Sequence, residues 1–235
     1  MLIVTSQAAA AVQVNDVHSR LNASQARQLV LVCSADAVAE SLSRARRRGW
    51  QVTAAGGCHA MGGQQFCEGG MVLDTRGMKR VLGLDPERGL LQVEAGITWP
   101  DLIRGYMKLQ HGGSTQWGLR QKQTGADRLT DGGALAANIH GAGLRLPPFI
   151  GDVESFELVD AGGALRHCSR TENAELFRLV IGGYGLFGVV VAATLRLARR
   201  EKVRRVVRLL DIEELPAAFE QRISDGYSYG DFQFC

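Results

Sequence analysis

The sequence lacks the features that define several classes of protein. Its formal net charge is only +3, which is too small to indicate nucleic-acid binding. No apolar run approaches the length of about 18 residues that a membrane-spanning helix needs. Residues 8–12 are mildly apolar, but no Lys or Arg precedes them, so they do not resemble an export signal.

Cysteine is also sparse. The five cysteines are an odd and widely spaced set that forms neither a zinc pattern nor a small disulfide scaffold. No set of His, Cys and Asp has the spacing of metal ligands. We therefore expect a reduced, cytoplasmic protein without bound metal, built as one large domain or two small ones.

Glycine, by contrast, is abundant: the chain has 29 glycines, and they cluster. The densest cluster is residues 55–64, Ala-Gly-Gly-Cys-His-Ala-Met-Gly-Gly-Gln. Glycine frees the backbone to adopt positive φ and to approach a ligand closely. Such a loop turns several N–H groups toward one anion, typically a phosphate. His59 within it is either a gap filler or a reactive group beside a cofactor.

A second cluster spans residues 123–141. Gly132 and Gly133 open a short Ala/Leu helix that we expect to end near residues 138–141. The N-terminus of this helix would suit a phosphate. A tightly packed Ala/Gly core helix is the alternative, and the segment alone does not decide between the two.

A third cluster, residues 182–188, contains a G-x-G-x-x-G pattern. The dinucleotide fingerprint with this pattern follows a strand and opens a helix. Here a helix is expected before it, at residues 172–181, and a strand after it, at residues 189–197. The acidic residue expected about 20 positions later is Arg208 instead. We therefore interpret the cluster as a turn from helix to strand.

Hydrophobic patterning elsewhere predicts short strands that alternate with isolated helices, which is an α+β arrangement. Ser34, Thr98 and Thr171 are the expected helix N-caps. The other expected helices are residues 35–48, 98–109 and 212–224, and the other expected strands are residues 29–33, 51–54, 71–74, 81–85, 90–94, 153–159 and 164–169.

Both ends of the chain differ from this pattern. Residues 14–22 are polar and irregular, and we expect an extended arm. The basic run of residues 199–208 is typical of a solvated strand face. Tyr227, Tyr229, Phe232 and Phe234 alternate like the residues of a strand that is meant to be buried. That strand has no successor with which to pair.

Together the three clusters resemble a known family. Gly-Gly-x-His-Ala-x-x-Gly at residues 56–63 is similar to the first pyrophosphate loop of the vanillyl-alcohol-oxidase-type FAD proteins. Gly-Gly-x-x-x-x-Asn-x-His-Gly at residues 132–141 resembles the family's second flavin loop. Gly-x-x-Gly-Val-Val at residues 185–190 resembles its third element, whose strand lines the adenine end of FAD. The resemblance covers about residues 14–200.

This resemblance implies a PCMH-type FAD-binding domain of α+β class in two subdomains. We place an N-terminal arm at residues 1–25, the FAD-binding domain at residues 26–200, and the start of a truncated substrate domain at residues 201–235. The residues implied in FAD binding are Ala55, Gly56, Gly57, Cys58, His59, Ala60, Gly62, Gly63, Gln64, Thr124, Gly125, Asp127, Gly132, Gly133, Leu135, Asn138, His140, Gly141, Gly185, Gly188, Val189 and Val190.

The histidines of these elements have open roles. In the resembled family the histidine at the position of His59 is often bonded covalently to the 8α carbon of the flavin. The alternative is a loop histidine beside noncovalent FAD. His140 either touches the flavin edge or caps its helix. Cys58 is expected to be structural, and His18, His111 and His167 are expected to be surface or packing residues.

The resemblance implies an FAD-dependent oxidase or dehydrogenase. It would transfer hydride from a C–H bond of an alcohol-, sugar- or hydroxy-acid-like substrate to flavin N5, and oxygen or another acceptor would reoxidise the flavin. Arg120 and Lys122 are candidates for substrate contact, whereas Trp99 and Trp117 are expected in the core. The catalytic base is not assigned, because in this family it lies largely beyond the FAD-binding domain. The alternatives are an NADPH-dependent reductase of the same fold and a non-catalytic FAD-binding fragment.

Overall fold

The N-terminal half is organised around a small parallel sheet. The computed structural model describes residues 11–113, 116–123 and 125–234. The sheet has the order β3 (Gln28–Leu31), β5 (Met71–Asp74), β4 (Val52–Ala55). Helix α1 (Ala35–Arg47) connects β3 to β4; its N-cap Ser34 accepts a hydrogen bond from the Ala37 N–H, as predicted. Gly49 follows the helix at φ +64°, where glycine avoids backbone strain.

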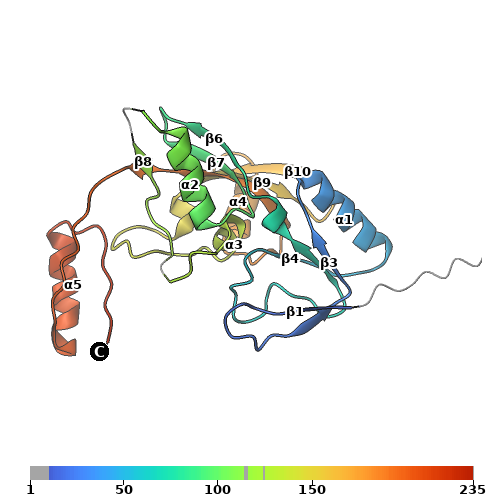
Figure 1. Cartoon of the computed structure of the whole chain (residues 1–235), viewed down its shortest axis with the longest axis horizontal. Coiled ribbons are helices and arrows are strands. Elements are labelled where there is room, and N and C mark those ends of the chain that lie inside the picture. Colours follow the sequence, from blue (N-terminus) through green and yellow to red (C-terminus); the bar gives the residue numbers. More distant parts are fainter. Residues whose placement is uncertain (1–10, 114–115, 124, 235) are drawn as a thin grey trace, which may run out of the picture.

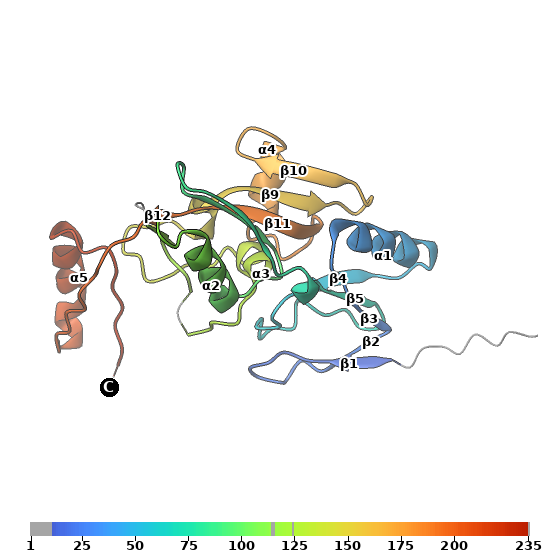
Figure 2. The same cartoon turned by 45° about the horizontal axis from the view of Figure 1, so that its top comes forward.

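The larger part of the fold is built on a five-stranded antiparallel sheet. Its order is β10 (Leu165–Ser169), β9 (Val153–Val159), β11 (Val189–Arg196), β7 (Leu90–Glu94), β6 (Val81–Asp85). Helices α2 (Trp99–Leu109), α3 (Asp131–Ala136) and α4 (Ala174–Val180) pack against one core with this sheet. Figures 1 and 2 show α1 on the side of the parallel sheet, and α2 and α3 beneath the larger one. The two sheets with separate helices confirm the predicted α+β class.

Strand β11 contributes to both hydrophobic cores. Val189 and Val191 pack with α1 and the parallel sheet, whereas Ala193 and Leu195 pack with α2, α3 and α4. Strict alternation would place Val191 and Ala193 on the same face. A register shift between Val190 and Ala192 opposite β9 interrupts that alternation. This bulge lets one strand serve two cores.

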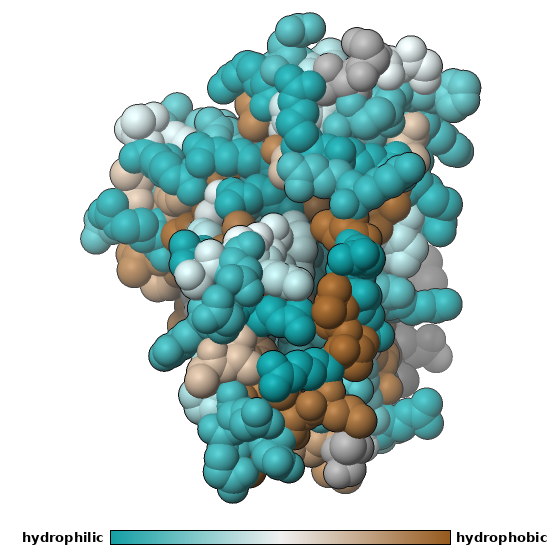
Figure 3. Space-filling model, turned by 90° about the vertical axis from the view of Figure 1, so that its left-hand side faces the viewer, coloured by the Kyte–Doolittle hydropathy of each residue, from teal (hydrophilic) through white to brown (hydrophobic). Residues whose placement is uncertain are grey.

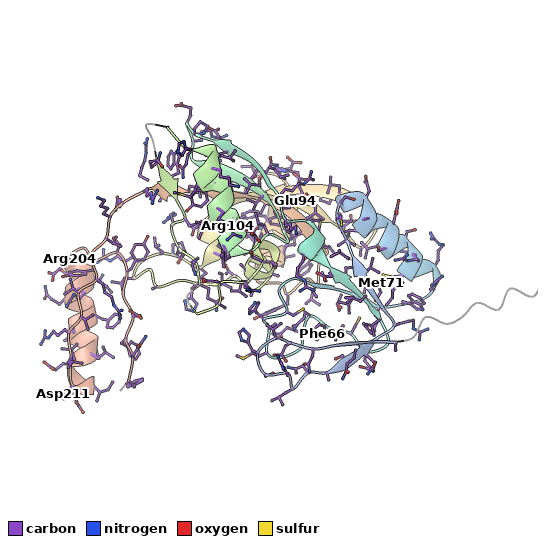
Figure 4. All side chains as sticks on the ribbon, viewed as in Figure 1. Phe66, Met71, Glu94, Arg104, Arg204 and Asp211 are labelled. Carbon is purple, nitrogen blue, oxygen red and sulfur yellow. The ribbon has the colours of Figure 1, made fainter. Side chains whose placement is uncertain are left out.

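The N-terminal segment is more ordered than the predicted extended arm. Strand β1 (Val12–Val14) pairs with β2 (Ser24–Ala26), and together they form an antiparallel hairpin. Val14 and Ala26 contact a third hydrophobic cluster together with Ala55 and Val72, and Phe66 packs against it. Figure 4 shows Phe66 in the loop region close to the hairpin. The polar residues between β1 and β2 form the connection of this hairpin rather than a free arm.

The C-terminal segment lies at the opposite end of the molecule from α1 (Figure 1). A short pair, β8 (Trp117–Gly118) with β12 (Ala198–Arg199), precedes it. Only Arg199 of the basic run lies in a strand, β12, and residues 200–210 form none, so the strand face predicted for the rest of the run is wrong. The chain then enters a 3-10 turn (Ile212–Glu214) and α5 (Leu215–Ser224), close to the predicted helix. Arg204 and Asp211 mark the extended segment beside α5 (Figure 4).

The aromatic strand predicted near the C-terminus does not form. Tyr229 makes a single bridge to Gly143, and Phe232 and Phe234 are 53% and 79% exposed. Figure 3, which views this end of the molecule, shows apolar side chains at the surface between hydrophilic ones. The alternation indicated a buried strand, but within the described residues no neighbouring strand covers it.

Two helix boundaries also differ from expectation. Helix α4 has Asn173 as its N-cap, at φ +46°, rather than Thr171. Thr171 instead belongs to a turn in which the Ser169 hydroxyl accepts hydrogen bonds from the N–H groups of Thr171 and Glu172. Helix α3 ends at Ala136, two residues before the predicted end. Among the described residues, no helix has the length and apolar character needed to cross a bilayer.

Candidate functional site

The first two glycine clusters are in contact. Residues 55–64, here called the first glycine loop, begin at the end of β4 and lie against residues 128–130. A Cβ atom on Gly56 would lie 2.1 Å from Oγ1 of Thr130, and one on Gly57 would lie 2.5 Å from the Arg128 carbonyl oxygen. Neither position tolerates a side chain without movement, so glycine is required for the close approach of the two backbones.

The second cluster is joined to the third by backbone hydrogen bonds at the C-terminal end of α3. The Gly182 N–H donates to the Leu135 carbonyl over 3.1 Å, and the Tyr184 N–H donates to the Ala136 carbonyl over 3.0 Å. The structure therefore brings all three predicted elements together around α3, although they are far apart in sequence.

The first glycine loop has unused hydrogen-bond donors. Among the described residues, none accepts a hydrogen bond from the backbone N–H groups of Gly57, Cys58, His59 and Ala60. Cys58 adopts φ +56° and Gly63 φ +71°, which are left-handed conformations that interrupt any extended or helical pairing. Consecutive free N–H groups of this kind form a concave site for an anion.

The start of α3 differs from the expectation that it binds a phosphate. The Asp131 N–H donates to the Ile97 carbonyl over 2.9 Å, and the Gly132 N–H donates to the Ala95 carbonyl over 2.7 Å. The Gly133 N–H donates to the Thr130 hydroxyl over 3.3 Å. The first three N–H groups of the helix are thus already satisfied. The packed core helix, which was the alternative interpretation, agrees with the structure.

Other predicted residues of the second cluster are held by the protein itself. Asp127 is paired with Lys122 at 2.5 Å. The Asn138 side-chain oxygen accepts a hydrogen bond from the Ile150 N–H, and Leu135 is fully buried in the core. His140 lies beyond the end of α3, so it does not cap that helix, and its exposed ring lies 3.2 Å from the Gly141 carbonyl. Gly125 is exposed at φ +84° with open space around it, and Thr124 lies outside the described residues.

The third element combines an exposed turn with a buried strand. Gly185 is exposed at φ +80°, with open space where a Cβ atom would lie. Gly188 has φ +145°, and a Cβ there would lie 2.6 Å from the Val159 carbonyl oxygen, so glycine is needed where β11 begins. Val189 and Val190 then enter the two cores. Within this element, only the turn is open to a ligand.

His59 is half-buried in the first glycine loop and has two partners. Its Nδ1 lies 2.7 Å from Nε2 of His18. Burial lowers the pKa of His59 and the charge of His18 lowers it further, whereas a hydrogen bond with the Arg128 carbonyl acts in the opposite direction. The net pKa lies below the ordinary value of a histidine, so the ring is neutral at physiological pH.

Sequence reasoning did not predict the contact of His18, which was expected only to be a surface or packing residue. The two histidines are 41 residues apart, and the polar segment that carries His18 offers no periodicity by which to place it. His167 is partly exposed, as expected for a surface residue, but its contact with Glu157 was not predicted: Nδ1 lies 2.7 Å from a carboxylate oxygen across β9 and β10. Cys58 packs against the third hydrophobic cluster, and burial raises the pKa of its thiol.

Asp131 is the most isolated polar side chain of this region. It is fully buried at the first position of α3, and neither carboxylate oxygen has a hydrogen-bond partner among the described residues. Burial raises its pKa from 3.8 to about 7. The side chain is therefore substantially protonated near neutral pH, and the protonated carboxyl group is uncharged in the core.

Arg120, one of the two residues expected to contact substrate, lies beside the C-terminal segment. Arg120 pairs with the buried Asp152 at 3.2 Å and lines a pocket of about 310 Å³ beside the C-terminal segment. The Tyr229 hydroxyl donates to the Arg120 carbonyl over 2.6 Å, so this segment closes one side of the pocket. Trp99 and Trp117 are buried, as expected for core residues.

The structure gives a fold of α+β class with three glycine elements gathered around α3, and comparison with known proteins identifies the family. Residues 26–169 match a family model described as FAD binding domain. This match includes the first two glycine elements and ends before the third. The chain belongs to the FAD-linked oxidoreductases that carry this PCMH-type FAD-binding domain.

Relatives in this family are oxidoreductases. The chain is 33% identical over 169 residues to an uncharacterized oxidoreductase, ORF5 of the fasciation locus, from Rhodococcoides fascians, covering 72% of this chain and 37% of that protein. It is 30% identical over 164 residues to L-gulonolactone oxidase from Bos taurus, covering 69% and 35%. The chain thus spans little more than a third of the length of these relatives.

A solved structure of alkyldihydroxyacetonephosphate synthase has the same fold. It aligns with a TM-score of 0.63 at 19% sequence identity, over 73% of this chain and 31% of that one. The likeness confirms the predicted fold of the FAD-binding domain.

Proposed function

We propose that the first glycine loop binds the pyrophosphate of FAD. The observation that carries this proposal is the row of four N–H groups, Gly57 to Ala60, without an acceptor among the described residues. Hydrogen bonds to a charged acceptor contribute roughly 1.5–3 kcal/mol each, so a few of them hold a pyrophosphate firmly. Gly56 and Gly57 allow the loop to lie close against residues 128–130.

In this proposal, parts of the other two glycine elements complete the site around the first glycine loop. The exposed turn at Gly185 and the residues that follow α3, Asn138 to Gly141, are the parts of the other two elements that a flavin nucleotide would reach. Leu135, Gly132 and Gly133 support the site from the core rather than by direct contact, because their side chains or N–H groups are already occupied.

We propose that the protein of which this chain forms the FAD-binding part oxidises a C–H bond of an alcohol-, sugar- or hydroxy-acid-like substrate. Bound FAD supplies a two-electron acceptor, and oxygen or another acceptor removes the electrons. The name of one relative, L-gulonolactone oxidase, supports this class of reaction. The contribution of this chain is to bind and orient the cofactor.

We further propose that His59 forms a covalent bond to the flavin methyl group. A neutral imidazole has a lone pair for such a bond, and burial together with His18 keeps the ring neutral. Attachment would break one methyl C–H bond and the imidazole N–H bond and form one C–N bond, and the two electrons and two protons released would pass to dioxygen to give hydrogen peroxide.

The test is the flavin content of the purified chain. We expect yellow protein with about one FAD per chain, and yellow colour that stays with the acid-precipitated protein. Gly57→Ala moves the loop and should weaken FAD binding more than about tenfold, an effect of about 1.4 kcal/mol or more. Gly83→Ala is the matched control, because no atom lies near a Cβ at this position in β6. Colourless wild-type protein that takes up no FAD would contradict the proposal.

Turnover assays separate the remaining alternatives. Oxygen consumption or dye reduction with sugar alcohols, sugar lactones and hydroxy acids supports an oxidase or dehydrogenase. NADPH oxidation instead supports a reductase of the same fold. FAD binding without either activity identifies this chain as a cofactor-binding unit.

A further inference from the structure

The pocket beside the C-terminal segment combines two arginines with other hydrogen-bond donors. Its volume of about 310 Å³ lies at the lower end of the range for sites that hold small molecules. Arg120 and Arg145 line it together with Tyr227, Ser228 and Tyr229, and none of the described residues in its lining is acidic. Guanidinium and hydroxyl groups donate hydrogen bonds, so the lining suits an oxygen anion rather than a cation.

The two arginines of the lining differ in how their charge is used. Arg120 pairs with the buried Asp152 at 3.2 Å, so a carboxylate of the protein already offsets its charge. Arg145 is exposed, and within the described part of the chain no carboxylate forms an ion pair with it. A carboxylate or phosphate group accepts two parallel hydrogen bonds from one guanidinium group, and Arg145 has this capacity unused.

The charges next to the lining leave the pocket positive. The guanidinium carbon of Arg222 on α5 lies 4.6 Å from the ring centroid of Tyr227. Asp225 precedes Gly226 of the lining, and its carboxylate accepts a hydrogen bond from the Gln221 side chain over 2.7 Å. Three arginines therefore face two carboxylates in and around the pocket, and the excess positive charge favours an anionic ligand.

The pocket adjoins the end of the second glycine element. The Gly141 N–H donates to the Gln121 side chain over 3.2 Å, and Gln121 follows Arg120 of the lining. Three residues after Gly141, the Leu144 N–H donates to the Ser228 carbonyl over 3.0 Å. Two sides of the pocket are thus attached to the segment that begins at Gly141.

The lining is held together by the protein's own hydrogen bonds. The Tyr229 hydroxyl donates to the Arg120 carbonyl over 2.6 Å, and the backbone of Tyr229 forms a bridge with Gly143. The Gln121 side chain donates to the Pro147 carbonyl over 2.6 Å. Three segments that are distant in sequence therefore form one unit, and a ligand does not have to order them on binding.

We propose that this pocket holds the oxyanion group of the substrate, a carboxylate or a phosphate, and that Arg145 is the residue that selects it. The inference rests on the proposed function, which places a flavin beside residues 138–141. It narrows the substrate to anionic compounds, namely hydroxy acids or phosphorylated sugars and polyols. A neutral polyol of the same length offers Arg145 no charged partner and binds more weakly.

The experiment compares ligands that differ only in the anionic group. The FAD-loaded chain is titrated with gluconate and with sorbitol, which share a six-carbon polyol chain, and then with glycerol 3-phosphate and with glycerol. Ligand-detected NMR gives the dissociation constants. In at least one pair the anion should bind about tenfold or more tightly than its neutral partner, and its affinity should fall as salt is added. The pair with the larger difference identifies the group as carboxylate or phosphate.

Arg145 variants test the residue itself. Arg145→Gln should weaken binding of the anion about tenfold or more and leave the neutral partner unchanged. Arg145→Lys keeps the charge but loses the planar fork, so it should show a smaller loss. Arg88→Gln is the matched control, because Arg88 is an exposed arginine in the turn between β6 and β7. Arg120 stays unchanged, since its removal would leave Asp152 buried without its pair.

The outcomes separate this proposal from the proposed function. An FAD-loaded chain that binds each anion no better than its neutral partner would overturn the role of the pocket. An unchanged affinity in Arg145→Gln, or an equal loss in Arg88→Gln, would also overturn it, because the pocket or its arginine would then not be responsible. A chain that binds the anion through Arg145 but takes up no FAD would instead overturn the proposed function, and with it the assignment of the pocket to a flavin substrate.

Discussion

The first glycine loop and the segment around α3 have similar compositions but use their glycines in opposite ways. In the loop, four consecutive N–H groups have no acceptor among the described residues. At the start of α3, three consecutive N–H groups donate to Ile97, Ala95 and Thr130. Glycine clusters therefore indicate where a backbone approaches something closely, but not whether the neighbour is a ligand or the protein's own core.

The largest expected effect comes from truncating α3 in its core. Leu135→Ala removes a side chain that is fully buried, and it should lower the free energy of unfolding by about 2–5 kcal/mol. Met61→Ala in the first glycine loop is the matched control: its side chain is 64% exposed, so the change should stay within about 0.5 kcal/mol. Denaturant unfolding measures both. Equal losses would show that the loop also belongs to the core.

The second prediction concerns the buried carboxyl group at the start of α3. The folded chain keeps Asp131 protonated up to about pH 7, whereas the unfolded chain releases this proton near its ordinary pKa of 3.8. Stability is therefore lost as pH rises from about 4 to 7. At about 1.36 kcal/mol per pKa unit, the loss amounts to roughly 4 kcal/mol.

Asp131→Asn removes this titration. The variant should become more stable than the wild type as pH rises from about 4 to 8, with the difference levelling off above about pH 7. Asp231→Asn, on the exposed C-terminal segment, is the control and should leave the pH profile unchanged. Parallel profiles for Asp131→Asn and the wild type would show that the buried carboxyl group has a partner after all.

The smallest effect is expected where the first glycine loop contacts the start of α3. Thr130→Ala removes the hydroxyl that caps α3 and lies against Gly56, and it should cost about 1 kcal/mol of stability. Thr130→Ser keeps the hydroxyl and should recover most of this loss. Thermal unfolding of the two variants decides the matter: if Ser and Ala are equally destabilising, methyl packing rather than capping is responsible.

Much of the fold follows from local patterns in the sequence. Ser34 and Gly49 mark the two ends of α1 because capping depends on residues within a few positions. The hairpin of β6 and β7 forms as predicted because the turn between the strands is short. The aromatic residues after Tyr227 show the limit of such patterns, since alternation indicates a strand only where another element covers it.

The candidate site was predictable in part for the same reason. The composition of the first glycine loop and the presence of His59 pointed to a phosphate-binding loop without knowledge of any contact. The partner of His59 was not predictable, because His18 reaches it only through the hairpin and the network around Asp16. Likewise, nothing in the spacing of Thr130, Asp131 and Gly132 shows which N–H groups at the start of α3 are already used.

The amino-acid sequence alone determined the α+β class, the positions of most helices and strands, and the three glycine elements, since each depends on interactions between residues close in the chain. Only the folded chain decided which histidines meet, and which N–H groups and which buried carboxyl group lack a partner among the described residues. These properties depend on residues that lie tens of positions apart in the sequence. Which of these residues meet is determined by the packing of the two hydrophobic cores on the strand that they share, β11.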